Sequence, residues 1–512
     1  MKFSQVYAAQ PDKLSGSIVS VEVDISRGLH SFSIVGMASK AVDEAKDRVN
    51  AAIKNAGYEP PKAKNEKLVI SLAPAELKKD GAYYDLAIAL GYLLSAGELD
   101  FNPEKKLFLG ELSLDGTVKP LRGILPIVQK AKEAGFEEVY LPTENAVEAA
   151  LVEGIKVYPT DSLQKIILHL RTTDEGASFS LPLQEATKIE IFEKDFPVDF
   201  SDVKGQEMVK RGLEIAAAGG HNVAMFGPPG TGKTMLARAF ASILPPLSRE
   251  EILEITGIHS IAGNLAKNEI LTHPPVRSPH HTSSYVAIIG GGTHPKPGEV
   301  TLAHRGVLFL DEFPEFDRKV LESLRQPLED RKVSISRAQG SVIFPASFIL
   351  LAAMNPCPCG FYGSELKACT CSPYEIQRYQ KKISGPIIDR IDIWLPVEHV
   401  DYEKLSEKPE KREKLSPLIR ERVEQARAFS FQRKGKKVLN REMNAREVQN
   451  EDLSPEVKQI LTKSAETMQL SPRAYHRVIK LARTIADMEA HEKIQVEHIL
   501  EALQYRPQSF QF

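Results

Sequence analysis

The residues best suited to chemistry lie in a glycine-rich run, 227–234, which reads Gly-Pro-Pro-Gly-Thr-Gly-Lys-Thr. It matches the pattern G-x-x-x-x-G-K-[ST] in full, with a buried strand predicted over 222–226 and a helix over 235–243. In such a loop, backbone N–H groups and the helix N-terminus hold phosphate oxygens. We predict that Lys233 reaches the β- and γ-phosphates of ATP and that the Thr234 hydroxyl ligates Mg²⁺. The predicted nucleotide-binding loop comprises Gly227, Pro228, Pro229, Gly230, Thr231, Gly232, Lys233 and Thr234.

Two further apolar runs, 306–310 and 348–354, are predicted to be buried strands that end in polar residues. The first is followed by Asp311, which would help to hold Mg²⁺, and by Glu312, which would orient or deprotonate the attacking water. The second is followed by Asn355, which would hydrogen-bond the γ-phosphate or that water. Ordinary strand ends and turns can also have these residues. The order of phosphate loop, Asp-Glu strand and Asn strand favours ATP hydrolysis.

All four cysteines fall in one short segment, as Cys357-Pro-Cys359 and Cys369-Thr-Cys371. Four thiolates in two close pairs can form a tetrahedral Zn²⁺ site, so we predict a structural zinc that holds the loop after Asn355 in place. The C-x-C spacing is tighter than the commoner C-x-x-C. Reduced thiols in a loop and a redox switch are the alternatives.

A basic hairpin is predicted between the Asp-Glu strand and the Asn strand, from the two strand-like runs 332–337 and 341–344. Arg331, Lys332 and Arg337 give this hairpin positive charge. These side chains would contact nucleic-acid phosphates, or they are ordinary solvated basic residues.

An insert over 256–299 contains five histidines. Their irregular spacing argues against a metal site. The glycines over 290–292 favour a mobile loop instead.

The composition limits the class of protein. The 512 residues suggest about three domains, and 42% hydrophobic with 26% charged residues is ordinary for a globular protein. The formal charge of −2 means that any grip on nucleic acid must be local. The N-terminus shows no apolar signal segment, and the apolar run 86–97 is too short to span a membrane. We expect a soluble, cytoplasmic protein.

The succession of strand-like and helix-like runs predicts an α/β fold class. We assign 1–170 to a first α/β domain, 171–195 to a linker, 196–400 to an ATPase core with a parallel sheet, and 401–512 to a C-terminal helical lid. Within the first domain we expect strands over 67–71 and 107–110, and helices over 41–56 and 125–134.

Residues 196–505 resemble an AAA+ ATPase of the magnesium-chelatase-like clade, and several motifs are similar to the ComM/YifB competence family. These motifs are Ile258-His-Ser-Ile-Ala-Gly263, Arg277-Ser-Pro-His-His281, Gly290-Gly-Gly292, Pro297-Gly-Glu-Val-Thr-Leu-Ala-His304 and Ser384-Gly-Pro-Ile-Ile-Asp-Arg-Ile-Asp392. The resemblance covers almost the whole chain. It implies a homo-hexameric ring with ATP between subunits, DNA as the substrate, recombination proteins as candidate partners, and Arg337 near a hairpin tip that lines the pore.

The resemblance also implies two catalytic arginines. Arg390 stands where the clade places its arginine finger, which would neutralise charge on a neighbouring subunit's γ-phosphoryl group. A local ion pair with the flanking Asp389 or Asp392 is the alternative. Arg473 follows Ser471, a predicted N-cap, where related ATPases keep the sensor-2 arginine. A solvated helix arginine is the alternative there.

The first domain resembles the Lon-type protease domain, of the ribosomal-S5-like superfamily. The likeness rests on Lys79-Asp-Gly81, Gly110-Glu-Leu-Ser-Leu-Asp-Gly-Thr-Val118 and Leu125-Pro-Ile127. Where the proteases carry a nucleophilic Ser and a Lys base, this chain has Tyr83 and Leu125, which cannot form a Ser–Lys dyad. We therefore predict no peptidase activity and a surface position for Lys79. The domain would bind DNA, a partner or its neighbours in a ring.

Together these features favour an ATP-driven, helicase-like DNA motor that promotes branch migration during homologous recombination of incoming DNA in natural transformation. The residues indicate ATP hydrolysis and a basic hairpin, and the family implies the DNA substrate. The alternatives are a metal-chelatase motor subunit, a remodelling factor acting on protein, an ATP-dependent protease and a non-enzymatic scaffold. The missing dyad argues against a protease, and an intact Glu312 and Arg390 argue against a scaffold.

Overall fold

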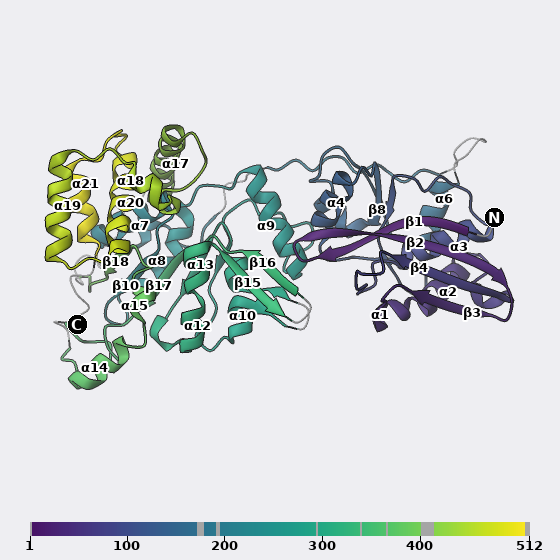
Figure 1. The fold of residues 1–512 in the computed structure, drawn as a ribbon, viewed down its shortest axis with the longest axis horizontal. Coiled ribbons are helices and arrows are strands. Elements are labelled where there is room, and N and C mark those ends of the chain that lie inside the picture. Colours follow the sequence, from purple (N-terminus) through teal and green to yellow (C-terminus); the bar gives the residue numbers. More distant parts are fainter. Residues whose placement is uncertain are drawn as a thin grey trace. The chain divides into compact units, whose positions relative to one another are not determined.

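A computed structural model describes most of the chain, as residues 3–171, 179–190, 195–292, 295–337, 340–364, 367–400 and 414–506. The chain divides into two compact units. The first unit is Met1–Glu190 with Ser248–Thr272, and the second is Ile191–Leu247 with His273–Phe512. Both units combine sheets with helices, so the predicted α/β class is confirmed (Figure 1).

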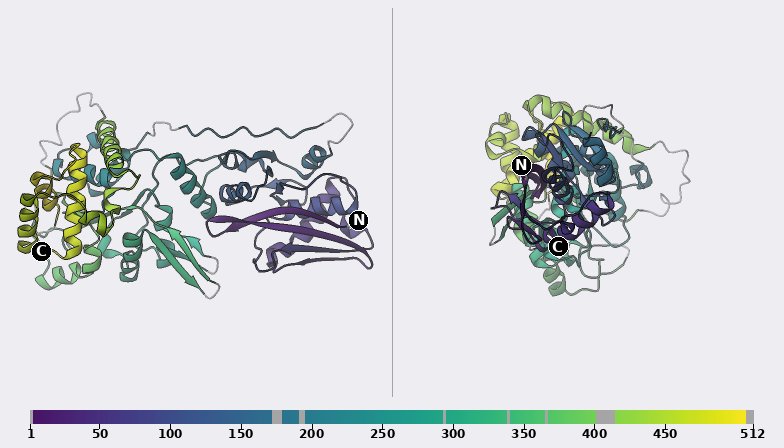
Figure 2. Two further views of the ribbon diagram at one scale, coloured as in Figure 1. Left: turned by 45° about the horizontal axis from the view of Figure 1, so that its top comes forward. Right: turned by 90° about the vertical axis from the view of Figure 1, so that its right-hand side faces the viewer.

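The first unit is built on a seven-stranded mixed sheet with the order β3-β4-β2-β1-β5-β8-β9. β1 (Phe3–Asp12) pairs antiparallel with β2 (Ser15–Arg27) over its whole length, and Figure 2 shows both as long purple strands. Val19, Val21 and Val23 are fully buried, as the period of two in a half-buried strand requires. The other strands are β3 (Ser31–Val35), β4 (Glu66–Ala73), β5 (Lys106–Phe108), β8 (Glu138–Pro142) and β9 (Lys156–Thr160), with a separate hairpin of β6 (Glu111–Leu112) and β7 (Val118–Lys119).

Helices complete the core of the first unit. The predicted strand 67–71 is confirmed as β4, and the predicted helix 125–134 as α4 (Ile124–Glu133). The predicted helix 41–56 is wrong in one respect, because the structure divides it at Glu44. The helical segments are α1 (Lys40–Asp43), α2 (Ala45–Asn55), η1 (Pro61–Ala63), α3 (Asp85–Ala96), η2 (Thr143–Asn145), α5 (Ala146–Ala149), α6 (Leu163–Leu170) and α9 (Arg249–Ala262).

Helix α9 belongs to the first unit, although in sequence it lies within the predicted ATPase core. The Gly123 amide, at the start of α4, donates a hydrogen bond to Ser260 Oγ at 2.9 Å. Arg249 forms an ion pair with Glu153 at 2.8 Å, and Leu253 packs against the apolar cluster around α4. The first unit therefore takes up a helix from the segment between α8 and β11.

Residues 179–190, within the predicted linker, are extended and also pack on the first unit. The Gln184 amide donates to the Val157 carbonyl at 2.9 Å, and Thr187 Oγ1 donates to the Val147 carbonyl at 2.8 Å. The rest of the predicted linker includes 172–178 and 191–194, which lie outside the described residues.

The second unit is built on five parallel strands in the order β11-β14-β17-β10-β18. The three strands predicted around the nucleotide motifs are confirmed as β10, β14 and β17. Nearly all their side chains are buried, as expected of a parallel sheet covered on both faces. The strands are β10 (Val223–Phe226), β11 (Val276–Arg277), β14 (Val307–Leu310), β17 (Ile349–Met354) and β18 (Ile393–Pro396).

Short hairpins and helices surround this sheet. The predicted basic hairpin is confirmed as β15 (Lys332–Arg337) paired with β16 (Gly340–Pro345), and a second small hairpin joins β12 (Gly290–Gly291) to β13 (Lys296–Pro297). The helical segments are η3 (Phe200–Asp202), α7 (Glu207–Gly219), α8 (Lys233–Phe240), η4 (Ala241–Ile243), α10 (Tyr285–Ile289), α11 (Glu299–Leu302), η5 (Phe313–Glu315), α12 (Arg318–Ser323), α13 (Arg325–Asp330), α14 (Pro373–Gln380) and α15 (Gly385–Ile388).

The C-terminal part of the second unit is helical, as predicted. Its described residues begin at 414, because residues 401–413 lie outside the described part of the chain. The helices pack with the sheet into one apolar cluster that contains Val223 and Leu395 from the sheet together with Val478 and Ile485. They are α17 (Leu415–Lys434), η6 (Asn440–Glu442), α18 (Ala445–Gln449), α19 (Pro455–Thr467), α20 (Pro472–Met488) and α21 (Val496–Gln504). Within the described ranges, no helix combines the length and apolar character needed to cross a membrane.

Candidate nucleotide site

The glycine-rich run forms a tight loop between β10 and α8. Gly227 must be glycine, because a Cβ there would lie 2.0 Å from the Val397 carbonyl oxygen. Gly232 caps α8 with a φ of 89°, and Lys233 is the first helical residue. The N-terminus of α8 therefore follows the glycine-rich loop directly, which is the arrangement of a phosphate-binding loop.

Lys233 is buried, with 8% of its surface exposed. Its Nζ donates to the carbonyls of Gly227 at 2.8 Å and Pro228 at 2.7 Å, and to Asn355 Oδ1 at 3.3 Å. Burial lowers the pKa of Lys233 to about 8, because the charged ammonium is partly removed from water. Among the described residues no carboxylate forms an ion pair with this ammonium, and a phosphate oxygen would supply that anionic partner.

The Asp-Glu strand brings its first carboxylate to the same loop. Thr234 Oγ1 donates a hydrogen bond to Asp311 Oδ2 at 2.8 Å. A hydroxyl and a carboxylate are hard oxygen ligands of the kind that Mg²⁺ prefers. The residues present therefore fit the metal that the motif implies.

Glu312 has an unusual backbone. Its φ of 51° and ψ of 43° place it in the left-handed region, which a residue with a side chain rarely adopts. Strain of this kind is concentrated at functional sites. The side chain is 57% exposed, and His281 Nδ1 lies 2.8 Å from Glu312 Oε2. The sequence reasoning did not identify His281 as a site residue, because nothing in the spacing of the histidines pairs it with a residue 31 positions away.

The sheet explains why these groups meet. β17 lies between β10 and β14, with Phe226 opposite Met354 and Leu310 opposite Ala352. In a parallel sheet the carboxyl ends of the strands share one edge, so the phosphate loop, the Asp-Glu pair and Asn355 emerge together. The structure thus brings Lys233 to Asn355 and Thr234 to Asp311, as two hydrogen-bonded pairs beside the same loop.

The two predicted catalytic arginines, Arg390 and Arg473, line a different cavity, of about 350 Å³. Arg390 and Arg473 both form ion pairs with Glu329, Arg473 at 3.4 Å. Arg390 is 9% exposed and its Nε has no hydrogen-bond partner among the described residues. Burial and then the nearby Arg473 and Arg477 lower the pKa of Arg390. The cavity wall contains no residue of the phosphate loop.

The local environment of each arginine is also defined. Asp392, the flanking residue considered as an alternative partner of Arg390, instead pairs with Arg477. The predicted start of α20 is confirmed, because Ser471 Oγ accepts a hydrogen bond from the Ala474 amide at 3.2 Å. Arg473 is 62% exposed in the first turn of this helix.

The predicted DNA-contacting residues are distributed along the hairpin. Arg331 lies at its base, in an ion pair with Glu442 at 3.0 Å. Lys332 is exposed on β15. Arg337 is the last residue of β15, and its side chain lies outside the described part of the structure.

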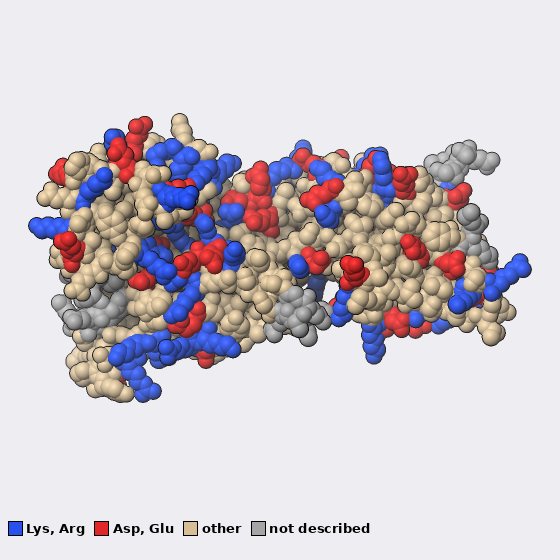
Figure 3. Space-filling model, in the orientation of Figure 1, with Lys and Arg blue, Asp and Glu red and all other residues tan. Residues whose placement is uncertain are grey.

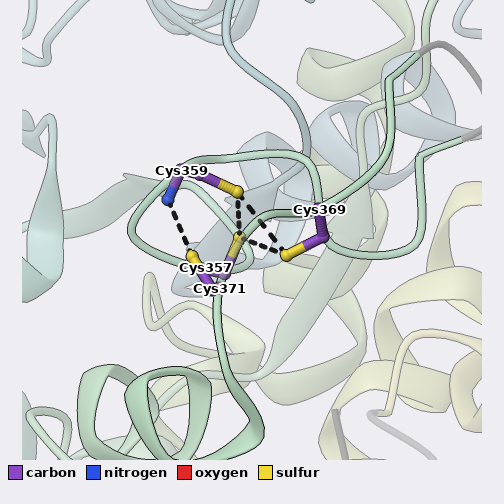
Figure 4. A group of neighbouring side chains, drawn as sticks. All are labelled: Cys357, Cys359, Cys369 and Cys371. Atoms are coloured by element: carbon purple, nitrogen blue, oxygen red, sulfur yellow. Dashed lines mark hydrogen bonds between the residues drawn. The ribbon is translucent and has the colours of Figure 1, made fainter.

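The four cysteines converge, as Figure 4 shows. Cys357 Sγ lies 3.4 Å from Cys359 Sγ and 3.7 Å from Cys369 Sγ, and all four sulfurs, including that of Cys371, lie within 4.8 Å of one another. All four cysteines are free thiols. A Zn–S bond of about 2.3 Å gives a tetrahedron with S···S edges of about 3.8 Å. A hydrogen bond from the Phe361 amide is the main cause that lowers the pKa of Cys359 to about 5. The donor set therefore fits zinc.

The cysteine loop rests on the nucleotide site. Gly360 has a φ of 85°, and a Cβ there would lie 2.7 Å from Pro229 Cδ in the phosphate loop and 3.7 Å from Asn355 Cγ. Only glycine permits this approach. Holding the cysteines together therefore holds one wall of the nucleotide site.

The former protease positions are occupied by packing residues. Tyr83 Oη donates to the Arg122 carbonyl at 3.2 Å, and burial raises the pKa of Tyr83 to about 12. Leu125 is fully buried. The predicted surface position of Lys79 is wrong: the residue is fully buried, and its Nζ donates to the Pro74 carbonyl. That carbonyl supplies a buried hydrogen-bond acceptor, which the sequence did not reveal.

The fold and the site together define a magnesium-chelatase-type AAA+ ATPase domain. The family description "Magnesium chelatase, subunit ChlI" matches residues 199–405, "Subunit ChlI of Mg-chelatase" matches 21–145, and "Magnesium chelatase, subunit ChlI C-terminal" matches 413–506. The N-terminal region is ChlI- and Lon-like, and Lon protease 2 of Bacillus subtilis is 31% identical over 168 residues, 31% of this chain and 29% of that protein.

Two relatives match nearly end to end. Competence protein ComM of Haemophilus influenzae is 38% identical over 509 residues, which cover 99% of this chain and 98% of that protein. YifB of Escherichia coli is 39% identical over 517 residues, 99% of this chain and 97% of that protein. The chain belongs to the ComM/YifB family.

Proposed function

We propose that the protein is a cytoplasmic, ATP-hydrolysing, hexameric DNA motor that promotes branch migration during recombination of incoming DNA. The observation that carries the proposal is the separation of the catalytic groups. Lys233, Asp311 and Glu312 sit at one sheet edge, whereas Arg390 and Arg473 share a cavity whose wall lacks the phosphate loop. Hydrolysis would then need two protomers.

Within one protomer, each side chain at the sheet edge has a distinct part. Lys233 would exchange its carbonyl partners for phosphate oxygens of ATP, and Thr234 with Asp311 would hold Mg²⁺. Mg²⁺ supplies charge neutralisation at the phosphates when bound. Glu312 would accept the proton of the attacking water, held in place by His281. Asn355 would orient that water or the γ-phosphate.

The arginine cavity supports action in trans. Arg390 is buried and paired with the carboxylate of Glu329, and its Nε has no hydrogen-bond partner within the part of the chain that the structure describes. A guanidinium with unused N–H donors can bind an anion such as a phosphoryl group through two hydrogen bonds. Arg473 shares the same carboxylate, Glu329, so both arginines would turn toward the γ-phosphate of an adjacent subunit and act together.

The action on DNA rests on the hairpin and on the family. Lys332 is exposed on β15, and Arg331 and Arg337 stand at the two ends of that strand. Six hairpins in a ring would line its pore and contact phosphates. A relative that covers nearly the whole chain is named a competence protein, which supports a role in handling incoming DNA.

The cysteine cluster would bind one structural Zn²⁺. Its sulfur geometry and its contact through Gly360 with the phosphate loop both support this assignment. We expect about one zinc per chain by elemental analysis. A paired Cys357→Ser and Cys371→Ser variant should lose it. Metal-free protein that instead forms disulfides reversibly would favour the redox switch.

The domain assignments follow from the same proposal. Residues 1–170 would form a Lon-like domain without peptidase activity, 171–195 a linker, 196–400 the AAA+ core and 401–512 the lid. In this scheme α9 would connect the core to the Lon-like domain through its packing on α4.

The test of the motor combines two measurements on the purified chain. ATP turnover is measured with and without a synthetic four-way DNA junction, together with conversion of that junction. We expect the junction to stimulate turnover and to be converted only with ATP. Turnover without stimulation or conversion would contradict the motor and favour a chelatase-type subunit or a factor that remodels protein.

The trans arrangement has its own test. Arg390→Ala and Lys233→Ala proteins should each be inactive. Mixed in equal amounts, they should recover turnover, because about one interface in four of a mixed ring pairs an intact Lys233 with an intact Arg390. Absence of recovery in rings shown to be mixed would mean that Arg390 acts within its own protomer.

A further inference from the structure

A basic cavity lies outside the nucleotide site, between η5 with α12 on one side and α14 on the other. Its volume is about 550 Å³, and its wall includes four cations, Arg318, Arg378, Lys381 and Lys382, but one carboxylate, Glu315. The wall therefore has a formal charge of +3, although the whole chain carries −2. Figure 3 shows Lys and Arg gathered along the edge where Figure 1 places α12 and α14.

Most of this charge is not neutralised locally. Lys382 forms an ion pair with Glu315 at 2.8 Å. Within the described chain, Arg318, Arg378 and Lys381 have no ion-pair partner, and all three are exposed. Like charges held close together repel one another, and a polyanion bound across them would remove that repulsion.

An aromatic ring stands beside the cations. Tyr374, in the first turn of α14, is 72% exposed. Ile376 and Tyr379 on the same helix are buried and hold it against the unit. The exposed ring is therefore presented on an anchored helix. Exposed aromatic rings among basic side chains are the platforms on which unpaired bases stack.

Both walls of the cavity are continuous with the nucleotide site. The residue after Glu312 begins η5, and α12 follows with Asp317 as its N-cap. On the other side, α14 begins at Pro373, two residues after Cys371. A ligand in the cavity would therefore press on the two segments that carry the candidate catalytic carboxylate and the cysteine cluster.

We propose that this cavity binds the sugar-phosphate backbone of single-stranded nucleic acid, with Arg318, Arg378 and Lys381 on neighbouring phosphates and Tyr374 beneath a base. The inference rests on the proposed action on DNA and adds a contact surface separate from the hairpin. Charge alone would also suit an acidic surface of a second copy of the chain. The exposed tyrosine favours the nucleic acid, because stacking needs unpaired bases.

The test compares two variants that each lose two positive charges. Arg378→Ala with Lys381→Ala removes charge from the cavity, and Lys458→Ala with Lys463→Ala removes it from the exposed face of α19. Binding of a fluorescent oligothymidylate is measured by anisotropy over a salt series. For the cavity variant we expect about tenfold weaker binding and a salt slope smaller by about 1.4, since each single-strand phosphate contact contributes about 0.7. The control variant should bind as wild type does, and basal ATP turnover without DNA should be unchanged in both.

The aromatic contribution is measured in the same assay. Tyr374→Ala should weaken binding about tenfold with an unchanged salt slope, whereas Tyr374→Phe, which keeps the ring, should bind as wild type does. Equal binding by both tyrosine variants would overturn the stacking contact.

The outcomes separate this inference from the proposed function. Wild-type protein that binds no DNA would contradict the proposed function and this inference together. If the wild-type protein binds the oligonucleotide and the cavity variant binds it equally tightly, this inference alone would be overturned. The cavity variant could instead lose its hexameric assembly in sedimentation velocity while its affinity for the oligonucleotide stays unchanged. That result would assign the cavity to the contact between copies of the chain, and it would also overturn this inference.

Discussion

Two regions of the molecule resemble catalytic sites, and only one retains the side chains that the chemistry needs. At the nucleotide edge, Lys233 donates to a carbonyl of the glycine-rich loop, and Thr234 donates to the carboxylate of Asp311. In the Lon-like domain, the positions of the nucleophile and the base hold Tyr83 and Leu125, and both are used for packing.

The two buried lysines make the contrast specific. Lys79 and Lys233 both donate to backbone carbonyls, and burial lowers the pKa of both. Lys233 lies in a loop whose amides are placed for phosphate, next to Thr234 and Asp311. A buried lysine therefore indicates function only together with the groups that face it.

The largest expected effect is at the nucleotide edge. Glu312→Gln keeps the shape of the side chain but removes its basicity, so ATP turnover should fall about 10²–10⁴-fold while ATP still binds. The matched change Glu104→Gln, at an exposed glutamate of the first unit, should leave turnover unaltered. Steady-state kinetics and nucleotide binding measure both. A Glu312→Gln protein with full turnover would remove the distinction between the two regions.

The second prediction concerns the Lon-like domain. Leu125 is fully buried in a cluster against which Leu253 of α9 packs. Leu125→Lys together with Tyr83→Ser restores the residue types of the dyad, but it should lower the free energy of unfolding by about 3 kcal/mol and produce no peptidase activity. Leu114→Lys, at a leucine that is 59% exposed, is the control and should change stability little. Urea unfolding and casein digestion provide the measurements. Digestion of casein by the double variant would show that the Lon-like domain still holds the two positions in a catalytic geometry.

The third prediction is a pH dependence at the nucleotide edge. The pKa of Lys233 in the free protein is about 8, and a bound phosphate would raise it, so binding takes up a proton above that pH. ATP affinity should reach its maximum well below pH 8, where Lys233 is protonated. It should fall as the pH rises through 8, to about tenfold lower at pH 9 than at pH 7. Titration with a fluorescent ATP analogue measures this, with circular dichroism at each pH to show that the fold is intact. An affinity that stays constant to pH 9 would mean that the ammonium is not the phosphate contact.

The smallest expected effect is at His281. Its Nδ1 lies 2.8 Å from Glu312 Oε2, so His281 would position that carboxylate. His281→Ala should lower kcat about fivefold with little change in KM, because the base is less well oriented. His30→Ala, at an exposed histidine of the first unit, is the control. Equal kinetics for the two variants would remove His281 from the site.

Much of the fold could be predicted from local patterns. Apolar runs ending at the phosphate loop, at Asp311 and at Asn355 predicted β10, β14 and β17, because buried parallel strands are continuous apolar segments. The hairpin and the cap at Ser471 followed from equally local chemistry. The break at Glu44 was missed, because a single apolar periodicity continues across it.

Contacts between distant segments could not be predicted in this way. The packing of α9 on α4 and the pairing of His281 with Glu312 each join residues that no periodicity relates. The shared carboxylate of Arg390 and Arg473 is of the same kind, since Glu329 lies 61 residues from one and 144 from the other.

The sequence alone therefore determined which chemical groups the chain possesses and which it has lost: a phosphate loop, an Asp-Glu pair and four clustered cysteines, but no Ser–Lys dyad. Their types and short spacings carry that information, because backbone geometry within a few residues is nearly independent of the rest of the fold. Tertiary structure decided which groups face one another. It brought Thr234 to Asp311 and His281 to Glu312, and it kept Arg390 in a cavity apart from the phosphate loop. Long-range packing sets those distances, and packing depends on the whole core at once.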